Sequence, residues 1–191
     1  MACVVVDVEA TCWDDLRHPH SEREIIEIGA VRLDDYYVEQ SWFSQTVRPV
    51  RHRELSEFCT QLTGITQAEV DAARGFAEVL ADFVAWAGAG EHWLCSWGVY
   101  DRRQLAYDAE FHGVALPEWF VTRHVDIRRG FIRWRGIDRC SLLHACKLIG
   151  QPFAGAHHRG LDDARNAAIV LGAWQRAHAQ LRARAAVLDV S

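Results

Sequence analysis

The sequence predicts an α/β fold in which a mixed β-sheet is flanked by helices on both faces. Three strand-like segments come first in the chain, and further strands then alternate with helices. An antiparallel start followed by strand–helix units is typical of such a sheet. The 191 residues suit a single domain over residues 1–191, and half of them are apolar, which is enough for a substantial core.

Apolar, β-branched residues mark the first three strands. Residues 2–8 are typical of a buried strand, residues 24–33 of a second strand, and residues 38–48 alternate in polarity as a third. The polar residues 13–23 are expected to form a loop. The dipeptide Asp34–Asp35 is the expected hairpin turn between the second and third strands.

The rest of the chain follows a helix–strand order. Residues 67–88 carry an apolar stripe at helical spacing and are predicted to form one helix. Beyond them we expect two strands and three helices, with the strands at 92–97 and 121–127 and the helices at 101–112, 141–149 and 161–187. Ribonuclease-H-like folds have this order of elements, and the sequence resembles that fold class.

The bulk composition excludes some classes of protein. No apolar run approaches about 18 residues, so we expect no membrane span. The N-terminal residues lack the basic start and apolar stretch of a signal peptide, which favours a cytoplasmic location. The six cysteines, none in Cys-x-x-Cys spacing, are therefore expected to be reduced and mostly packed. A structural zinc site is not expected, because the paired spacing is absent.

The charge of the chain is acidic overall but uneven. A formal net charge of −5 argues against a general nucleic-acid coat protein, which is normally basic. The stretch 123–147 contains only two acidic residues, Asp126 and Asp138. Its basic residues are Arg123, Arg128, Arg129, Arg133, Arg135, Arg139 and Lys147. This stretch either binds nucleic-acid phosphates or is a solvated arginine-rich face, and both interpretations remain open.

Three carboxylates stand at the ends of the predicted strands. Asp7 and Glu9 are two apart on the first strand, so their side chains share one face, where a hard cation such as Mg²⁺ would stabilise them. The alternative is a solvated strand end. Asp101 follows the apolar strand and the glycine of Ser-Trp-Gly-Val-Tyr-Asp, where it is either a further ligand or a helix N-cap.

The segment that enters the last helix carries a histidine and two acids. His158 and Asp163 are five residues apart, and an imidazole at this place can take a proton from an attacking water. The neighbouring Asp162 is an alternative ligand. The competing interpretation is a surface histidine followed by acids that the helix dipole favours. Four acids and one histidine at strand ends and helix starts are what two-metal phosphodiester hydrolysis needs.

These motifs resemble the DEDDh exonucleases of the DnaQ-like superfamily. The family pattern is Asp-x-Glu, an Asp in a second motif, and His-x-x-x-x-Asp, and it is matched in order by Asp7, Glu9, Asp101, His158 and Asp163. The Eri-like and KapD-like branch is the more similar one. That likeness rests on Asp-Val-Glu-Ala-Thr-Cys at 7–12, Glu-Ile-Ile-Glu-Ile-Gly at 24–29, Leu-Ser-Glu-Phe-Cys at 55–59 and Leu-Thr-Gly-Ile-Thr at 62–66.

The resemblance implies a ribonuclease-H-like fold and a metal-dependent 3′–5′ exonuclease. It implies two Mg²⁺ ions, for which Mn²⁺ would substitute, and release of nucleoside monophosphates from a free 3′ end of RNA or single-stranded DNA. The four matched acids would bind the ions, and His158 would act as general base. RNA or DNA preference and oligomeric state stay open.

The resemblance also suggests substrate-binding residues. It implies that Ile65 or its neighbours pack against the terminal base and that Trp97 lies near the nucleotide. Ala10, Thr11 and His158 complete the predicted substrate-binding set. For Ile65 and Trp97 the alternative is plain core packing.

Two other functions compete with an exonuclease. One is a catalytically idle protein that binds nucleic-acid ends or regulates a partner on the same fold, against which the complete set of acids and histidine counts. The other is an endonuclease of the ribonuclease H type, which the Asp-x-Glu and His-x-x-x-x-Asp pairing fits less well.

Overall fold

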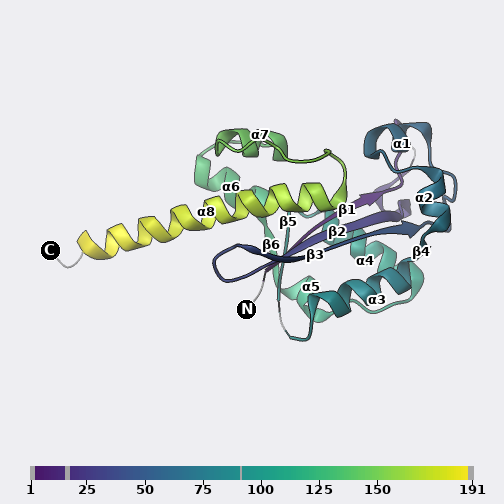
Figure 1. Cartoon of the computed structure of the whole chain (residues 1–191), viewed down its shortest axis with the longest axis horizontal. Coiled ribbons are helices and arrows are strands. Elements are labelled where there is room, and N and C mark those ends of the chain that lie inside the picture. The colour runs from purple at the N-terminus through teal and green to yellow at the C-terminus, as the bar shows by residue number, and fades with distance from the viewer. Residues whose placement is uncertain (1–2, 16–17, 91, 189–191) are drawn as a thin grey trace.

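A six-stranded mixed sheet forms the centre of the computed structural model (Figure 1). The structure describes residues 3–15, 18–90 and 92–188. The sheet has the strand order β4-β3-β2-β1-β5-β6. Its strands are β1 (Cys3–Ala10), β2 (Ile25–Leu33), β3 (Glu39–Arg48), β4 (Arg74–Gly75), β5 (Trp93–Ser96) and β6 (His124–Asp126). Since helices flank this mixed sheet, the predicted fold class is confirmed.

The helices divide between the two faces of the sheet. The α-helices are α1 (Glu57–Thr63), α2 (Gln67–Ala72), α3 (Phe76–Ala87), α4 (Tyr100–His112), α5 (Glu118–Thr122), α6 (Ile127–Arg135), α7 (Leu142–Leu148) and α8 (Gly160–Leu188). Helices α3, α4 and α5 pack on the Val4, Val6 and Val8 side of β1. Helices α6, α7 and α8 pack on the Val5 side. Because side chains alternate between the two faces of β1, this one strand contributes valines to two separate hydrophobic cores.

Strand β1 is the pivot of the sheet. It pairs antiparallel with β2 and parallel with β5, so it is covered on both edges as well as both faces. Its register sets Asp7 opposite Gly29 and Glu9 opposite Glu27. Asp7 and Glu9 have the same parity as Val5, and therefore point to the face that α8 covers.

The prediction of one helix over residues 67–88 was wrong. Helix α2 ends at Ala72, and Ala73 is extended with φ −76° and ψ 161°. Strand β4 then pairs with Val47 and Arg48 of β3 before α3 begins. The apolar stripe belongs to two helices that pack in different places, because Val70 lies in a small cluster with Cys12 and Ile65, while the later members enter the main core.

The strand predicted at 121–127 is shorter than expected. Only His124–Asp126 forms β6, because α5 runs to Thr122 and α6 begins at Ile127. Asp126 ends the strand by capping α6, since its carboxylate accepts a hydrogen bond from the Arg129 N–H at 2.8 Å. The sequence analysis also missed α1, α5, α6 and a 3₁₀ turn at His20–Glu22 inside the predicted loop.

Some expectations fall at the limits of the described residues. Residue 2 of the first predicted strand and residues 16–17 of the predicted loop lie outside them. All six cysteines are free thiols, four of them buried. Within the described ranges, no helix combines the length and apolarity that a bilayer span requires.

Two glycines bring the start of α8 against the sheet. A Cβ added at Gly29 would lie 2.0 Å from the Gly160 carbonyl carbon and 2.0 Å from the Leu161 nitrogen. A Cβ at Gly160 would in turn meet the Gly29 nitrogen at 2.9 Å and the Asp7 oxygen at 3.1 Å. The helix backbone therefore rests directly on the β1–β2 pair, which only residues without a side chain allow.

We predict that Gly29→Ala destabilises the fold by about 1–3 kcal/mol, the usual range for overpacking a closed contact. The new methyl group would force the start of α8 away from β1. Urea unfolding of the variant and the wild type measures the difference. Gly75→Ala is the matched control, because the nearest atom to its new Cβ is a flexible Glu78 oxygen at 3.9 Å. Equal stability of the two variants would contradict the packing assignment.

Candidate active site

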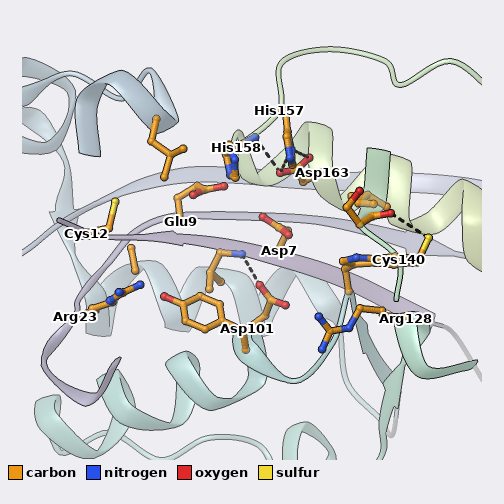
Figure 2. A pocket seen from close by; sticks show the side chains of 17 residues that line it. Asp7, Glu9, Cys12, Arg23, Asp101, Arg128, Cys140, His157, His158 and Asp163 are labelled. Carbon is orange, nitrogen blue, oxygen red and sulfur yellow. Dashed lines mark hydrogen bonds and ion pairs between the residues drawn. The ribbon is translucent and has the colours of Figure 1, made fainter. Parts of the chain in front are cut away.

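A cavity of about 440 Å³ opens at the end of β1 and holds the four predicted carboxylates (Figure 2). Asp7 and Glu9 reach it from β1, Asp101 from the first turn of α4 and Asp163 from the first turn of α8. Oxygen atoms of Asp7, Glu9 and Asp163 lie within 4.8 Å of one another. Three elements far apart in sequence thus bring their acids to one place.

Asp101 is held as part of the site rather than as a helix cap. The N-cap position of α4 is Val99, and Asp101 lies two residues further on. Its carboxylate accepts a hydrogen bond from the Val8 N–H at 3.1 Å, although the two residues are 93 apart in sequence. The side chain is almost fully buried beside β1. The N-cap alternative is therefore excluded.

Burial and mutual repulsion make the ionised forms of these carboxylates unfavourable. Burial, followed by repulsion from Asp101 and Glu9, raises the pKa of Asp7 well above its usual range. Burial, then repulsion from Asp163, raises the pKa of Glu9 to about 8. Burial also raises the pKa of Asp101 to about 6. Buried like charges of this kind are stabilised by a cation, and a purely oxygen donor set suits a hard divalent ion.

Two histidines cover Asp163. His157 Nδ1 lies 3.0 and 3.1 Å from the two carboxylate oxygens of Asp163. The backbone N–H of His158 donates a hydrogen bond to the same carboxylate at 3.0 Å. The two imidazole rings stack with their centroids 4.0 Å apart. His158 has a φ of 65°, which turns its half-buried ring over the cavity. Burial, then the neighbouring His157, lowers the pKa of His158.

His157 is a site residue to which the sequence analysis gave no role. It was visible only as the neighbour of His158 in the His-His-Arg-Gly segment. Its contact with Asp163 is the kind of outer hydrogen bond that orients a metal-binding carboxylate. The position of His157 in the sequence did not indicate a role distinct from that of His158.

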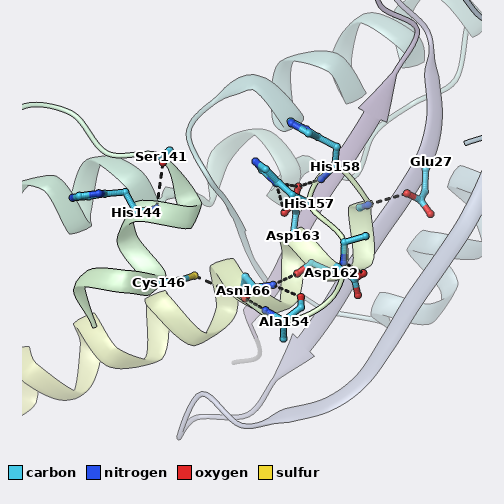
Figure 3. A network of polar contacts seen from close by, with 12 residues as sticks. Glu27, Ser141, His144, Cys146, Ala154, His157, His158, Asp162, Asp163 and Asn166 are labelled. Atoms are coloured by element: carbon cyan, nitrogen blue, oxygen red, sulfur yellow. Dashed lines mark hydrogen bonds and ion pairs between the residues drawn. The ribbon is translucent and has the colours of Figure 1, made fainter. Parts of the chain in front are cut away.

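A polar network fixes the loop that carries both histidines (Figure 3). Glu27 is 2% exposed and accepts hydrogen bonds from the Arg159 side chain at 3.0 and 3.3 Å and from the Gly160 N–H at 2.8 Å. Asn166 holds the other side of the loop through the Ala154 backbone, accepting at 3.1 Å and donating at 2.8 Å. The loop is therefore tied to β2 at one end and to α8 at the other.

Asp162 has a structural place in this network. Its carboxylate accepts from the Ala156 N–H at 2.8 Å and does not line the cavity. Asp163 is the member of the pair that faces Asp7 and Glu9. The alternative ligand considered from the sequence is thus excluded by geometry.

The predicted substrate-binding residues divide into two groups. Ala10, Trp97 and His158 line the cavity. Thr11 does not, because it is 1% exposed and its Oγ1 accepts a hydrogen bond from the Glu24 N–H at 3.0 Å. Ile65 does not line the cavity either, because it is completely buried in the small cluster with Cys12, as the core-packing alternative expects.

Other cavity-lining residues were missed. Leu62, from the same segment as Ile65, lines the cavity in its place. Arg23, Tyr100 and Arg128 line it as well. Arg128 comes from the basic stretch 123–147, which also lines the cavity with Cys140, Ser141 and Leu142. Arg129 and Arg133 of this stretch face another hollow.

Comparison with known proteins identifies the family. The model of the exonuclease family RNase T matches residues 4–171. The chain belongs to the RNase T exonuclease family. ERI1 exoribonuclease 2 of Mus musculus is 34% identical over 194 residues, covering 90% of this chain and 28% of the relative. The 3′–5′ exoribonuclease 1 of Homo sapiens is 32% identical over 174 residues, covering 86% of this chain and 49% of the relative.

Solved structures agree with this assignment. The nuclease domain of 3′hExo, a DEDDh family member bound to rAMP, matches with a TM-score of 0.83 and 30% identity over 92% of both chains. Exonuclease I, at 14% identity and a TM-score of 0.74, shares the fold. The predicted DEDDh family and ribonuclease-H-like fold are confirmed. The chain spans about a quarter to a half of the length of the two exoribonucleases above.

We predict that the stability of the protein in EDTA falls as pH rises from about 5 to 8. The folded state holds a proton on Glu9 up to its raised pKa of about 8, whereas the unfolded state releases that proton near the ordinary glutamate pKa of 4.5. Between these values the folded state binds more protons, so a higher pH favours unfolding. Thermal melts across this range measure the slope, and Glu9→Gln should flatten it. A melting temperature that rises with pH in the wild type would contradict the assignment.

Proposed function

We propose that this chain removes nucleoside monophosphates from the 3′ end of single-stranded RNA with the help of two bound Mg²⁺ ions. The observation that carries the proposal is the meeting of four carboxylates and His158 in one cavity. RNA is favoured over DNA because two exoribonucleases, of Mus musculus and Homo sapiens, share 34% and 32% identity with this chain. Single-stranded DNA is the alternative substrate, and Mn²⁺ the alternative ion.

Asp7, Glu9, Asp101 and Asp163 would hold the ions, since they are the acids that line the cavity. Bound there, divalent ions would acidify a water and neutralise charge on the phosphate and the departing oxygen. The side chains supply the rest. His157 keeps the Asp163 carboxylate in position, and the Glu27 network keeps His158 at the mouth of the cavity.

His158 is the group suited to take the proton from the attacking water. Its ring lines the cavity, and its lowered pKa leaves the imidazole neutral and able to accept a proton near pH 7. As the water oxygen bonds to phosphorus, the bond from phosphorus to the 3′-oxygen of the preceding nucleotide breaks, and that oxygen takes up a proton to become the new 3′-hydroxyl. The products are a nucleoside 5′-monophosphate and a strand shortened by one residue.

We predict that Asp7→Asn and Asp163→Asn each slow Mg²⁺-dependent shortening of a 5′-labelled RNA by about a hundredfold or more, since metal activation supplies several kcal/mol. Asp162→Asn is the matched control and should retain most of the activity, because Asp162 faces away from the cavity. Gels of RNA and DNA strands of one sequence, with Mg²⁺ or Mn²⁺, measure both rate and preference. A circular strand should stay intact.

Three results would contradict this function. Full activity of both ligand variants would remove the metal site. A wild-type protein that binds oligonucleotides without shortening them would be an idle end-binding protein. Cleavage of the circular strand would indicate an endonuclease.

We predict that substitutions of His158 and His157 have different kinetic effects. His158→Ala should lower kcat by about 10²–10⁴-fold with little change in the Mg²⁺ concentration for half-maximal rate, because a proton acceptor is lost. His157→Ala should instead raise that concentration by about 10–100-fold, because the Asp163 carboxylate loses its orienting partner. Rates at a series of Mg²⁺ concentrations distinguish the two. Identical profiles for both variants would overturn this division of roles.

A further inference from the structure

A second hollow, of about 190 Å³, adjoins the active-site cavity. It lies between the 3₁₀ turn at His20–Glu22, one face of α4 and the start of α6. Trp97, Tyr100 and Arg128 line both spaces, so the two hollows share a wall.

One face of α4 has an unusual composition here. Tyr100, Arg103, Gln104 and Tyr107 follow the i, i+3, i+4, i+7 spacing of a helix stripe, which is usually apolar and buried. Gln104 is buried, but Arg103 and Tyr107 are exposed. The helix therefore presents a guanidinium group and a phenol ring to the hollow.

The hollow is cationic although the chain is acidic. Its lining contains Arg103, Arg128 and His20 but no aspartate or glutamate, against a net charge of −5 for the whole chain. Neither the Arg103 nor the Arg128 guanidinium makes a hydrogen bond or ion pair with another described residue. Two arginine side chains without carboxylate partners in one hollow suit an anionic ligand.

Arg128 lies at the boundary between the two hollows. Its guanidinium nitrogen would be 3.4 Å from a Cβ added at Gly98, whose φ of 105° favours glycine. The guanidinium thus lies across the Gly98 backbone, and a side chain there would press against it. This places one cation within reach of both spaces.

We propose that the second hollow binds the nucleotide that precedes the 3′-terminal one, an inference that rests on the proposed exonuclease function. A nucleotide joins a phosphate to a flat base, and arginines beside aromatic rings bind both parts of single-stranded nucleic acid. Arg128 and Arg103 bind the backbone phosphates on the 5′ side of the cleaved bond. The base packs against Tyr107 or His20, whose ring lies 5.4 Å from that of Tyr100.

Arg103→Ala tests the proposal with two substrates. For a single-stranded RNA octanucleotide it should raise KM about tenfold with little change in kcat, as expected for one lost charge-assisted hydrogen bond. It should also reduce the slope of log affinity against log salt by about 0.7, the value for one phosphate contact on a single strand. The p-nitrophenyl ester of thymidine 5′-monophosphate has no preceding nucleotide, so its turnover should change less than about twofold.

Two further variants sharpen the experiment. Arg103→Lys should restore part of the affinity, because it restores the charge. Arg135→Ala is the matched control, since it removes the same charge from the end of α6, outside both hollows. It should leave the octanucleotide KM unchanged.

The outcomes separate this proposal from the one on which it rests. Equal losses on both substrates, or no loss on the octanucleotide, would overturn the second-nucleotide site. A wild-type protein inactive on both substrates would instead overturn the exonuclease function.

Discussion

The contact between Gly29 of β2 and Gly160 of α8 is the constraint on which the site depends. It lets the helix backbone touch the sheet, with the Asp7 carbonyl oxygen 3.1 Å from the position of a Cβ on Gly160. Asp163, three residues into the same helix, is thereby brought to the acids of β1. A side chain at either glycine would act as a spacer between helix and sheet. The geometry of the carboxylate cluster and the packing of the core are therefore fixed by the same contact.

Bringing Asp163 close to the acids of β1 is electrostatically unfavourable. Four acids converge where burial and mutual repulsion raise the pKa of Asp7 and Glu9. The loop before α8 is held by hydrogen bonds, since Glu27 accepts three of them and Asn166 bonds to the Ala154 backbone. A rigid frame around an unfavourable centre is what pre-organised metal sites require.

Sequence reasoning succeeded where the chemistry follows strand alternation and short spacing. Asp7 and Glu9 share a face because they are two apart, and His158 and Asp163 meet because one helical turn and a short loop separate them. It failed where tertiary contacts decide. The break at Ala73 exists because β4 pairs with β3, and Ile65 is core because α1 and α2 close over it. The role of His157 and the arrival of Arg128 likewise depend on long-range packing.

The distribution of charge explains how an acidic chain can accept a polyanion. The acids gather in the active-site cavity, while the adjoining hollow is lined by arginine and histidine and by no acid. Arg128 belongs to both linings, so one cationic side chain lies between the acids and the second hollow. Without cations the cavity would repel a phosphodiester, and the neighbouring hollow would attract the strand that enters it. The net charge of −5 therefore describes neither surface, and the local arrangement of acids and arginines determines what the site can bind.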